Sequence, residues 1–102
     1  MPKMSRYILD ENNEPQEVDD LLEWALSLED SERRQVAFDT LENGTKVSTV
    51  FLGWDASHGL REGAPLLFET AAFGHDSFHV MDRHTTWAEA QEGHARAVKL
   101  LA

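Results

Sequence analysis

The pattern of hydrophobic and polar positions gives its best strand candidate in the middle of the chain, from Lys46 to Gly53. β-Branched and aromatic side chains dominate this stretch, which predicts a β-strand. Val47, Thr49 and Phe51 share one face, and the other face is also apolar, as expected of an inner strand. A second apolar run, Pro65 to Phe73, is expected to pair beside it.

Turn residues indicate further strands on either side of this pair. Asn43-Gly44 follows the run Gln35 to Leu41 and predicts a tight hairpin turn with positive φ at both central residues. A short first strand is expected at Arg6 to Asp10. A last strand is expected at Ser77 to Arg83, after a turn at Gly74 to Asp76.

Two segments have the spacing of amphipathic helices. The first is expected to begin at Asp19 or Asp20 and to carry Trp24 beside one apolar stripe that faces the sheet. That stripe consists of Leu21, Leu22, Ala25 and Leu28. The second helix is expected to begin at Thr86, which forms a capping box with Glu89. Its apolar face consists of Trp87, Ala90, His94, Ala97, Val98 and Leu101.

These elements predict a single domain over residues 1–102 with an α+β fold. Two helices are expected to pack on one face of an antiparallel sheet of four or five strands. Gly93 is expected to let the second helix approach the sheet closely. Residues 1–4 are expected to be disordered, or Met1 to Lys3 to precede a natural start at Met4.

Charge is distributed very unevenly along the chain. The formal net charge is −10, and no Lys or Arg lies between Tyr7 and Glu32. Ten acidic residues fall in that segment: Asp10, Glu11, Glu14, Glu17, Asp19, Asp20, Glu23, Glu29, Asp30 and Glu32. Arg33 and Arg34 follow and are expected to neutralise part of the group. An acidic surface repels nucleic acid and anionic lipid and favours a basic protein partner.

Composition narrows the function further. The chain has no cysteine, which excludes disulfides and thiolate chemistry. No apolar run approaches the ~20 residues that cross a bilayer, and the N-terminus lacks a signal-peptide pattern. We therefore expect a cytoplasmic protein that does not bind membranes. No phosphate-binding loop or dinucleotide fingerprint occurs, so no cofactor is expected.

Histidines are the first candidates for chemistry. His75 and His79, with aspartates nearby, are metal ligands by type and motivate the hypothesis of a metal-dependent enzyme. Against a metal site, His79 and His84 are separated by an odd number of residues and should point to opposite faces of a strand. His94 is expected to be a core histidine bonded to a backbone carbonyl.

Other polar and aromatic residues give weaker signals. Asp55, Ser57 and His58 share a loop but lack a nucleophile elbow, so no catalytic residue is predicted. Trp54 in the same loop is expected either to anchor an interface or to pack over the sheet edge. Glu69, inside an apolar strand, is expected to face solvent or to pair with a basic neighbour.

Four blocks together resemble a family of small proteins encoded by bacteriophages and prophages. The blocks are Ser5 to Asp10, Val47 to Gly53, Pro65 to Thr70, and Thr86 to Ala90 with Gly93 and His94. The segment Ala71 to His75 departs from the family pattern, where a Met and paired glycines are typical. The resemblance implies a genomic setting and carries over no catalytic or binding residue. Small acidic proteins of that setting include inhibitors such as anti-CRISPR proteins, which present carboxylates to a basic groove.

The leading hypothesis is an acidic phage-type inhibitor of a host protein, such as a CRISPR effector, that competes with nucleic acid. The expected partner-binding residues are Asp10, Glu11, Glu14, Glu17, Asp19, Asp20, Glu23, Glu29, Asp30 and Trp54. The alternative is a phage accessory or assembly protein that acts as a homo-oligomer through an apolar sheet face or Trp54. The third hypothesis is the metal-dependent enzyme that uses His75 and His79.

Overall fold

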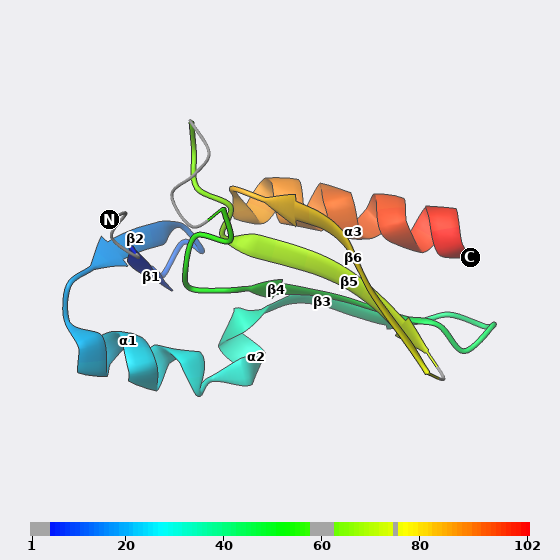
Figure 1. Ribbon diagram of the computed structural model, residues 1–102, viewed down its shortest axis with the longest axis horizontal. Coiled ribbons are helices and arrows are strands. Elements are labelled where there is room, and N and C mark those ends of the chain that lie inside the picture. The colour runs from blue at the N-terminus through cyan, green and yellow to red at the C-terminus, as the bar shows by residue number, and fades with distance from the viewer. Residues whose placement is uncertain (1–4, 58–62, 75) are drawn as a thin grey trace.

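A computed structural model describes residues 5–57, 63–74 and 76–102. The molecule is elongated, 42 × 28 × 26 Å, and its N-terminal strands and helices gather at one end (Figure 1). Within the described residues the strands are β1 Arg6–Leu9, β2 Pro15–Val18, β3 Gln35–Thr40, β4 Lys46–Phe51, β5 Phe68–Gly74 and β6 Ser77–His84. The helices are α1 Leu21–Leu28, α2 Ser31–Arg34 and α3 Trp87–Leu101.

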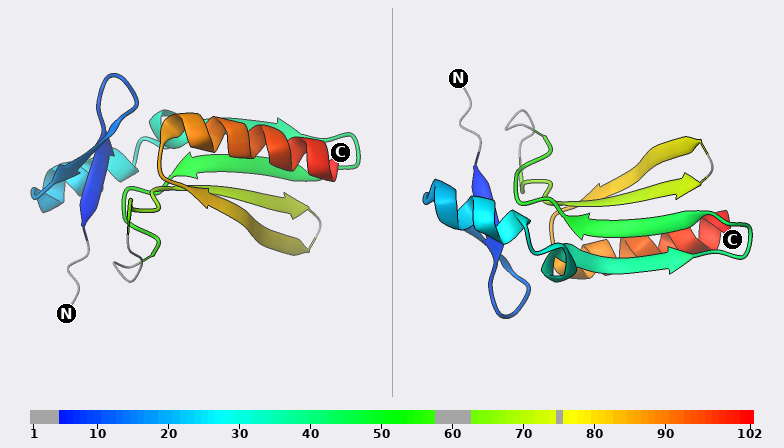
Figure 2. Two further views of the ribbon diagram at one scale, coloured as in Figure 1. Left: turned by 90° about the horizontal axis from the view of Figure 1, so that it is seen from above. Right: turned by 90° about the horizontal axis from the view of Figure 1, so that it is seen from below.

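Strands β3 to β6 form an antiparallel sheet in chain order. Helix α3 lies along one face of this sheet (Figure 2). The core between them contains Phe51, Leu67, Phe68 and Ala90, with Trp87 packed against it. The rings of Phe68 and Trp87 meet edge to face with centroids 6.2 Å apart, a favourable aromatic geometry.

The inner-strand prediction is confirmed. Strand β4 pairs with β3 on one side and β5 on the other, and Val47, Thr49 and Phe51 are at most 2% exposed. The hairpin between β3 and β4 is also confirmed, but its predicted turn type is wrong. Gly44 has a φ of +89°, whereas Asn43 has no positive φ. The hairpin therefore uses a three-residue loop in which glycine alone takes the left-handed conformation.

Strands β1 and β2 form a separate antiparallel sheet, and α1 packs against β1. Two hydrogen bonds attach this end to the main sheet through the carbonyl oxygen of Gly53. The Tyr7 amide donates to it at 2.9 Å, and Nε1 of Trp24 donates at 2.8 Å. The α+β prediction with an antiparallel sheet is confirmed, with a third short helix and a two-stranded sheet as additions.

The helix predicted after Asp20 is present as α1, and Asp20 caps it. The orientation predicted for its apolar stripe is wrong. Leu21 is 57% and Leu22 67% exposed, because the Trp24 side of the helix is the one bonded to Gly53. Ala25 is also exposed, and Leu28 alone of the stripe is half-buried.

Helix α3 begins at Thr86, whose hydroxyl oxygen accepts the amide of Glu89 at 3.1 Å. Its predicted apolar face is confirmed, with Ala90, His94 and Ala97 buried. Gly93 is buried as well, and its close approach is to the ring of His84 on β6. Three expectations concern residues outside the described ranges. The first is that residues 1–4 are disordered. The second is that His58 shares a loop with Asp55 and Ser57, and the third is that His75 lies in a turn and is a candidate metal ligand.

Candidate interaction surfaces and a buried histidine network

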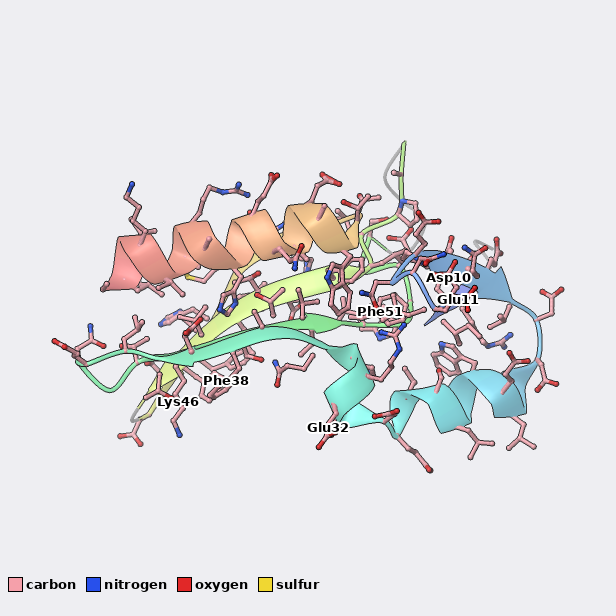
Figure 3. All side chains as sticks on the ribbon, turned by 180° about the vertical axis from the view of Figure 1, so that it is seen from behind. Asp10, Glu11, Glu32, Phe38, Lys46 and Phe51 are labelled. Atoms are coloured by element: carbon pink, nitrogen blue, oxygen red, sulfur yellow. The ribbon has the colours of Figure 1, made fainter. Side chains whose placement is uncertain are left out.

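The ten acidic residues of the Asp10–Glu32 segment lie on β2, α1, α2 and the connections from the β1–β2 turn onward, at one end of the molecule. Figure 3 shows Asp10 and Glu11 near the β1–β2 turn and Glu32 on α2, so these carboxylates surround the end rather than form one flat face. We call this region the acidic end. Its anionic field extends on several sides of the small sheet and helices.

Within the described residues Arg33 and Arg34 form no ion pair with the acids from Glu29 to Glu32. Arg33 donates to the carbonyl oxygen of Asp10 and to Oδ1 of Asn13, and its charge adds to the amide hydrogen bonds that lower the pKa of Asp10. Arg34 donates to the carbonyl oxygens of Phe51 and Leu28, both at 3.0 Å, and so ties α1 and α2 to the main sheet.

Some acids of this end have structural roles. Asp10 accepts the amides of Asn12 at 2.8 Å and Glu14 at 3.0 Å, and these bonds hold its pKa below the usual value. Asp20 and Asp30 cap α1 and α2. Six glutamates have no ion pair within the described residues and remain available: Glu11, Glu14, Glu17, Glu23, Glu29 and Glu32.

Helix α1 presents an apolar surface in the middle of this acidic end. Leu21, Leu22 and Leu26 are 57%, 67% and 56% exposed. We call these three residues and Ala25 the leucine face. Glu23 lies beside it, and the C-cap residue Glu29 follows at its end. Apolar residues bordered by charge are the usual composition of a protein-binding patch.

A second apolar surface lies on the face of the main sheet opposite α3, which we call the open face. Phe38, Phe78 and Val80 are 47%, 63% and 44% exposed there. Phe73 joins them, with its ring centroid 6.4 Å from Phe38 and 6.5 Å from Phe78. Figure 3 shows Phe38 on the side away from α3, at the end of the sheet far from Asp10. Nothing local in the sequence marks this cluster, because its members come from three strands.

Glu69 pairs with a basic neighbour, as expected. Nε of Arg83 donates to its Oε2 at 3.2 Å, and the two residues face each other across β5 and β6. Trp54 is half-buried, and its main chain forms an isolated β-bridge with Arg6. Its role as an interface anchor stays a prediction.

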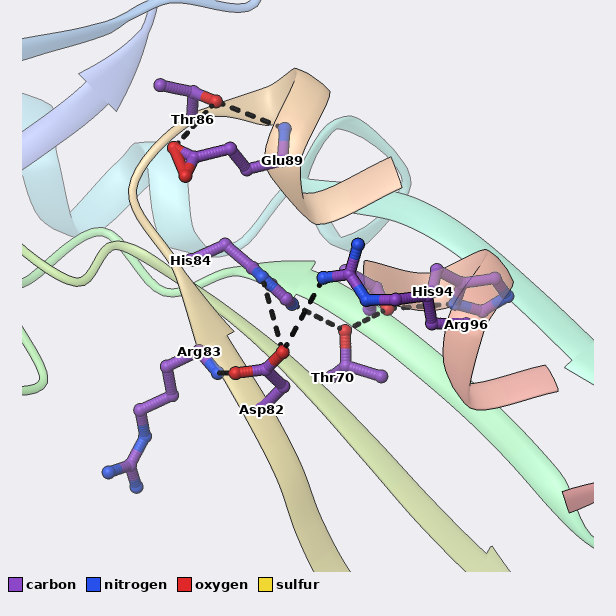
Figure 4. Close-up of polar contacts among 9 residues, drawn as sticks. Thr70, Asp82, Arg83, His84, Thr86, Glu89, His94 and Arg96 are labelled. Atoms are coloured by element: carbon purple, nitrogen blue, oxygen red, sulfur yellow. Dashed lines mark hydrogen bonds and ion pairs between the residues drawn. The ribbon is translucent and has the colours of Figure 1, made fainter. Parts of the chain in front are cut away.

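Four buried side chains form a hydrogen-bonded chain between α3 and the sheet. Oγ1 of Thr49 lies 2.7 Å from Oγ1 of Thr70 and 2.8 Å from Nδ1 of His94. Nε2 of His84 lies 3.0 Å from Oγ1 of Thr70, and Nε2 of His94 lies 2.7 Å from Oδ2 of Asp39. Figure 4 shows the part of this network around Thr70. We call these four buried residues and the exposed Asp39 the histidine network.

One arrangement of protons satisfies the whole network with both imidazoles neutral. His84 donates to Thr70, Thr70 to Thr49, and Thr49 to Nδ1 of His94, whose Nε2 then donates to Asp39. No buried side-chain nitrogen or oxygen within the described residues lacks a partner. Thr49 and Thr70 are 0% exposed, so their hydroxyls are shielded from solvent, and the network joins α3 to the sheet.

The structure corrects two expectations about histidines. His94 is a core residue, but it bonds the side chains of Thr49 and Asp39 in place of a backbone carbonyl. His79 and His84 lie on the same face of β6, because a bulge between Val80 and Asp82 shifts the register by one residue. Sequence spacing could not reveal that bulge.

Acid is expected to destabilise the protein through His84. Burial, with Arg96 nearby, lowers the pKa of His84 from 6.5, while Asp82 and Glu89 oppose the shift. A folded pKa below the unfolded one means that this contribution to stability is complete above pH 6.5 and is lost as pH falls below it.

Urea unfolding at pH 7.5, 6.5 and 5.5 measures this slope. We expect a His84→Asn variant to reduce it and the exposed-residue control His79→Gln to leave it unchanged. An unchanged slope in His84→Asn would contradict the assignment.

The described residues offer little for other chemistry. They contain no group of three or more His, Cys, Asp or Glu side chains placed to hold a metal ion. A hollow of about 610 Å³ lies between the β1–β2 turn and the start of α3, lined by Tyr7, Glu14, Leu67 and Trp87 among others. No helix in the described ranges has the length and apolar character needed to cross a membrane.

The site therefore consists of two exposed apolar surfaces, one on α1 inside the acidic end and one on the face of the main sheet opposite α3. Comparisons with protein-family models, with curated proteins and with solved structures find no match to this chain.

Proposed function

We propose that this protein is an interaction module whose acidic end binds a basic protein partner. The observation that carries the proposal is the leucine face, where α1 turns three leucines to solvent inside the acidic segment. Burying a leucine is worth about 1.5–3 kcal/mol, so an exposed helix face of this kind favours a partner that covers it. The partner would supply an apolar groove or helix edged by Lys or Arg.

The two parts of this surface have different roles. The unpaired glutamates attract the partner over distance and raise the association rate, an effect that salt screens. The leucines supply contact energy that salt does not remove. The proposal thus differs from attraction by charge alone, which would vanish as ionic strength rises.

A narrower proposal concerns the class of partner. A basic groove that holds nucleic acid would also accept this anionic end, so binding would compete with nucleic acid. Inhibition of a host nucleic-acid complex, and the resemblance to phage proteins that suggested it, stay predictions. A cytoplasmic site of action belongs to the same proposal.

Binding is tested with a synthetic helical peptide that carries lysines on one face and leucines on the other. We expect the double substitution Leu22→Ser/Leu26→Ser to weaken binding by at least about tenfold, because part of the apolar contact is lost. The matched control is Leu100→Ser, an equally exposed leucine on α3 outside the acidic end. Isothermal titration at low and high salt separates the apolar part from the charged part.

A charge variant completes the test. Glu11→Gln, Glu14→Gln, Glu23→Gln and Glu29→Gln together should flatten the salt dependence while leaving the fold intact, since none of these carboxylates makes an ion pair within the described residues. Equal affinity of the leucine variant and the Leu100→Ser control would contradict the proposed surface.

A further inference from the structure

We propose that the open face of the sheet is the interface of a closed dimer of two copies of this chain. This face lies outside the acidic end and goes beyond the function proposed for it. Phe38, Phe73, Phe78 and Val80 form a continuous apolar cluster there, joined by ring contacts of 6.4 and 6.5 Å. Helix α3 covers one face of the sheet. The solvent face of an antiparallel sheet is usually polar, whereas this one carries exposed apolar side chains.

Charge identifies the occupant as a second copy. The whole chain carries −10, but the described charged residues on the open face and at its rim are Lys46, Glu69, Arg83 and Asp76, of which Glu69 and Arg83 pair at 3.2 Å. Their formal charges sum to zero, from two cations and two anions. Two copies that met at their acidic ends would set carboxylates against carboxylates, whereas they can meet at this face without that repulsion.

The face is also self-complementary. Lys46 lies opposite Phe73, and Glu69 stands four residues earlier on β5, about 13 Å away at ~3.3 Å per residue. Two copies can stack face to face about a two-fold axis that runs between the sheets, in their plane and perpendicular to the strands. The strands of one copy then run opposite to those of the other. Lys46 of each copy therefore lies over the end of the other copy's face that holds Glu69, and the two Lys46–Glu69 contacts form together.

Small residues at the centre of the face allow close approach. Ser48 and Ala71 are directly opposite each other on β4 and β5, between the row of Phe73 and the row of Glu69. Sheets pack face to face at about 10 Å when their facing side chains interdigitate. The exposed phenylalanines on either side, Phe38 on β3 and Phe78 on β6, would enclose this centre.

A foreign partner fits this face less well. A basic partner would be drawn to the acidic end and away from a face without net charge. Any acidic partner, a second copy included, is repelled by the chain unless the two meet at surfaces without excess carboxylates. A second copy has such a surface, because it presents the same open face.

Sedimentation velocity of the full chain at about 1–200 µM tests the proposal by measuring the fraction of protein that is dimeric at each concentration. We expect a concentration-dependent dimer that Phe78→Ser abolishes and Leu100→Ser retains; both side chains are exposed, at 63% and 74%. Circular dichroism checks that each variant is folded.

Charge reversal gives the sharper result. Lys46→Glu and Glu69→Lys alone should each weaken the dimer at least about tenfold, since like charges then face each other twice. Mixing the two variants should restore dimer formation, as a heterodimer, because both inter-copy contacts are then Glu–Lys pairs again. Native mass spectrometry identifies the heterodimer by its mass. Monomers of the unmodified chain at every concentration would overturn the proposal. Assemblies that grow beyond two copies, a dimer indifferent to Phe78→Ser, or a mixture no tighter than its components would do the same.

Discussion

Replacing Gly93 with alanine is expected to destabilise the protein by about 2–4 kcal/mol, although alanine is the better helix former by ~1 kcal/mol. A Cβ at this position would lie 2.5 Å from Nε2 of the buried His84 ring and closer still to Cε1. The ring cannot move aside without leaving Thr70, to which it is bonded at 3.0 Å. Overpacking costs about 1–3 kcal/mol and an unsatisfied buried donor a similar amount.

A double-mutant cycle isolates the cause. In a His84→Ala background the obstructing ring is gone, so Gly93→Ala should become stabilising by about 1 kcal/mol through helix propensity alone. Urea or thermal unfolding of the four proteins in the cycle gives both values. If Gly93→Ala has the same effect in both backgrounds, the contact between α3 and His84 is not what selects glycine.

Replacing Thr70 with valine is expected to cost about 2–3 kcal/mol, even though the two side chains have nearly the same shape. The hydroxyl of Thr70 joins Thr49 at 2.7 Å to His84 at 3.0 Å, so its loss leaves a buried imidazole N–H without a partner. This loss of stability arises because the imidazole of His84 stays buried in the variant and cannot bond to water instead.

Two matched variants test that explanation. Thr70→Ser keeps the hydroxyl and should lose less stability than Thr70→Val. Thr40→Val places the same change on an exposed position of β3 and should stay within about 0.5 kcal/mol of the unmodified protein. If chemical unfolding gives the same free energy of unfolding for Thr70→Val and Thr40→Val, the histidine network contributes no stability.

Features with a local cause were predictable from the sequence. The alternation from Lys46 to Phe51 identified the inner strand β4, and Thr86 with Glu89 identified the start of α3. Asn43-Gly44 identified a hairpin but not its turn type, because a two-residue and a three-residue loop use the same glycine.

Features set by tertiary contact were not predictable. Strand β2 contains Pro15, Gln16 and Glu17, which favour strands little, and it forms because the turn at Asp10 brings it beside β1. Helical spacing located the leucines of α1 but could not say which side faces the protein, since the bond from Trp24 to Gly53 decides that.

The histidine network and the open face depend on even longer-range pairings. Thr49 meets His94 across 45 residues, and Asp39 meets the same histidine across 55. Phe38 and Phe78 both meet the ring of Phe73, which follows only from the strand order and register. Local sequence carries no signal for either arrangement. Charge segregation was visible in the sequence because the acidic segment is continuous and folds as one end of the molecule.

The most direct measurement is capture of partners from a bacterial lysate by the immobilised chain, quantified by mass spectrometry. The unmodified protein, Leu22→Ser/Leu26→Ser and Leu100→Ser would be compared at low and at physiological salt. We expect the unmodified protein and Leu100→Ser to retain the same basic proteins, and the double variant to lose them. Retention of the same proteins by all three would contradict binding through the leucine face of the acidic end.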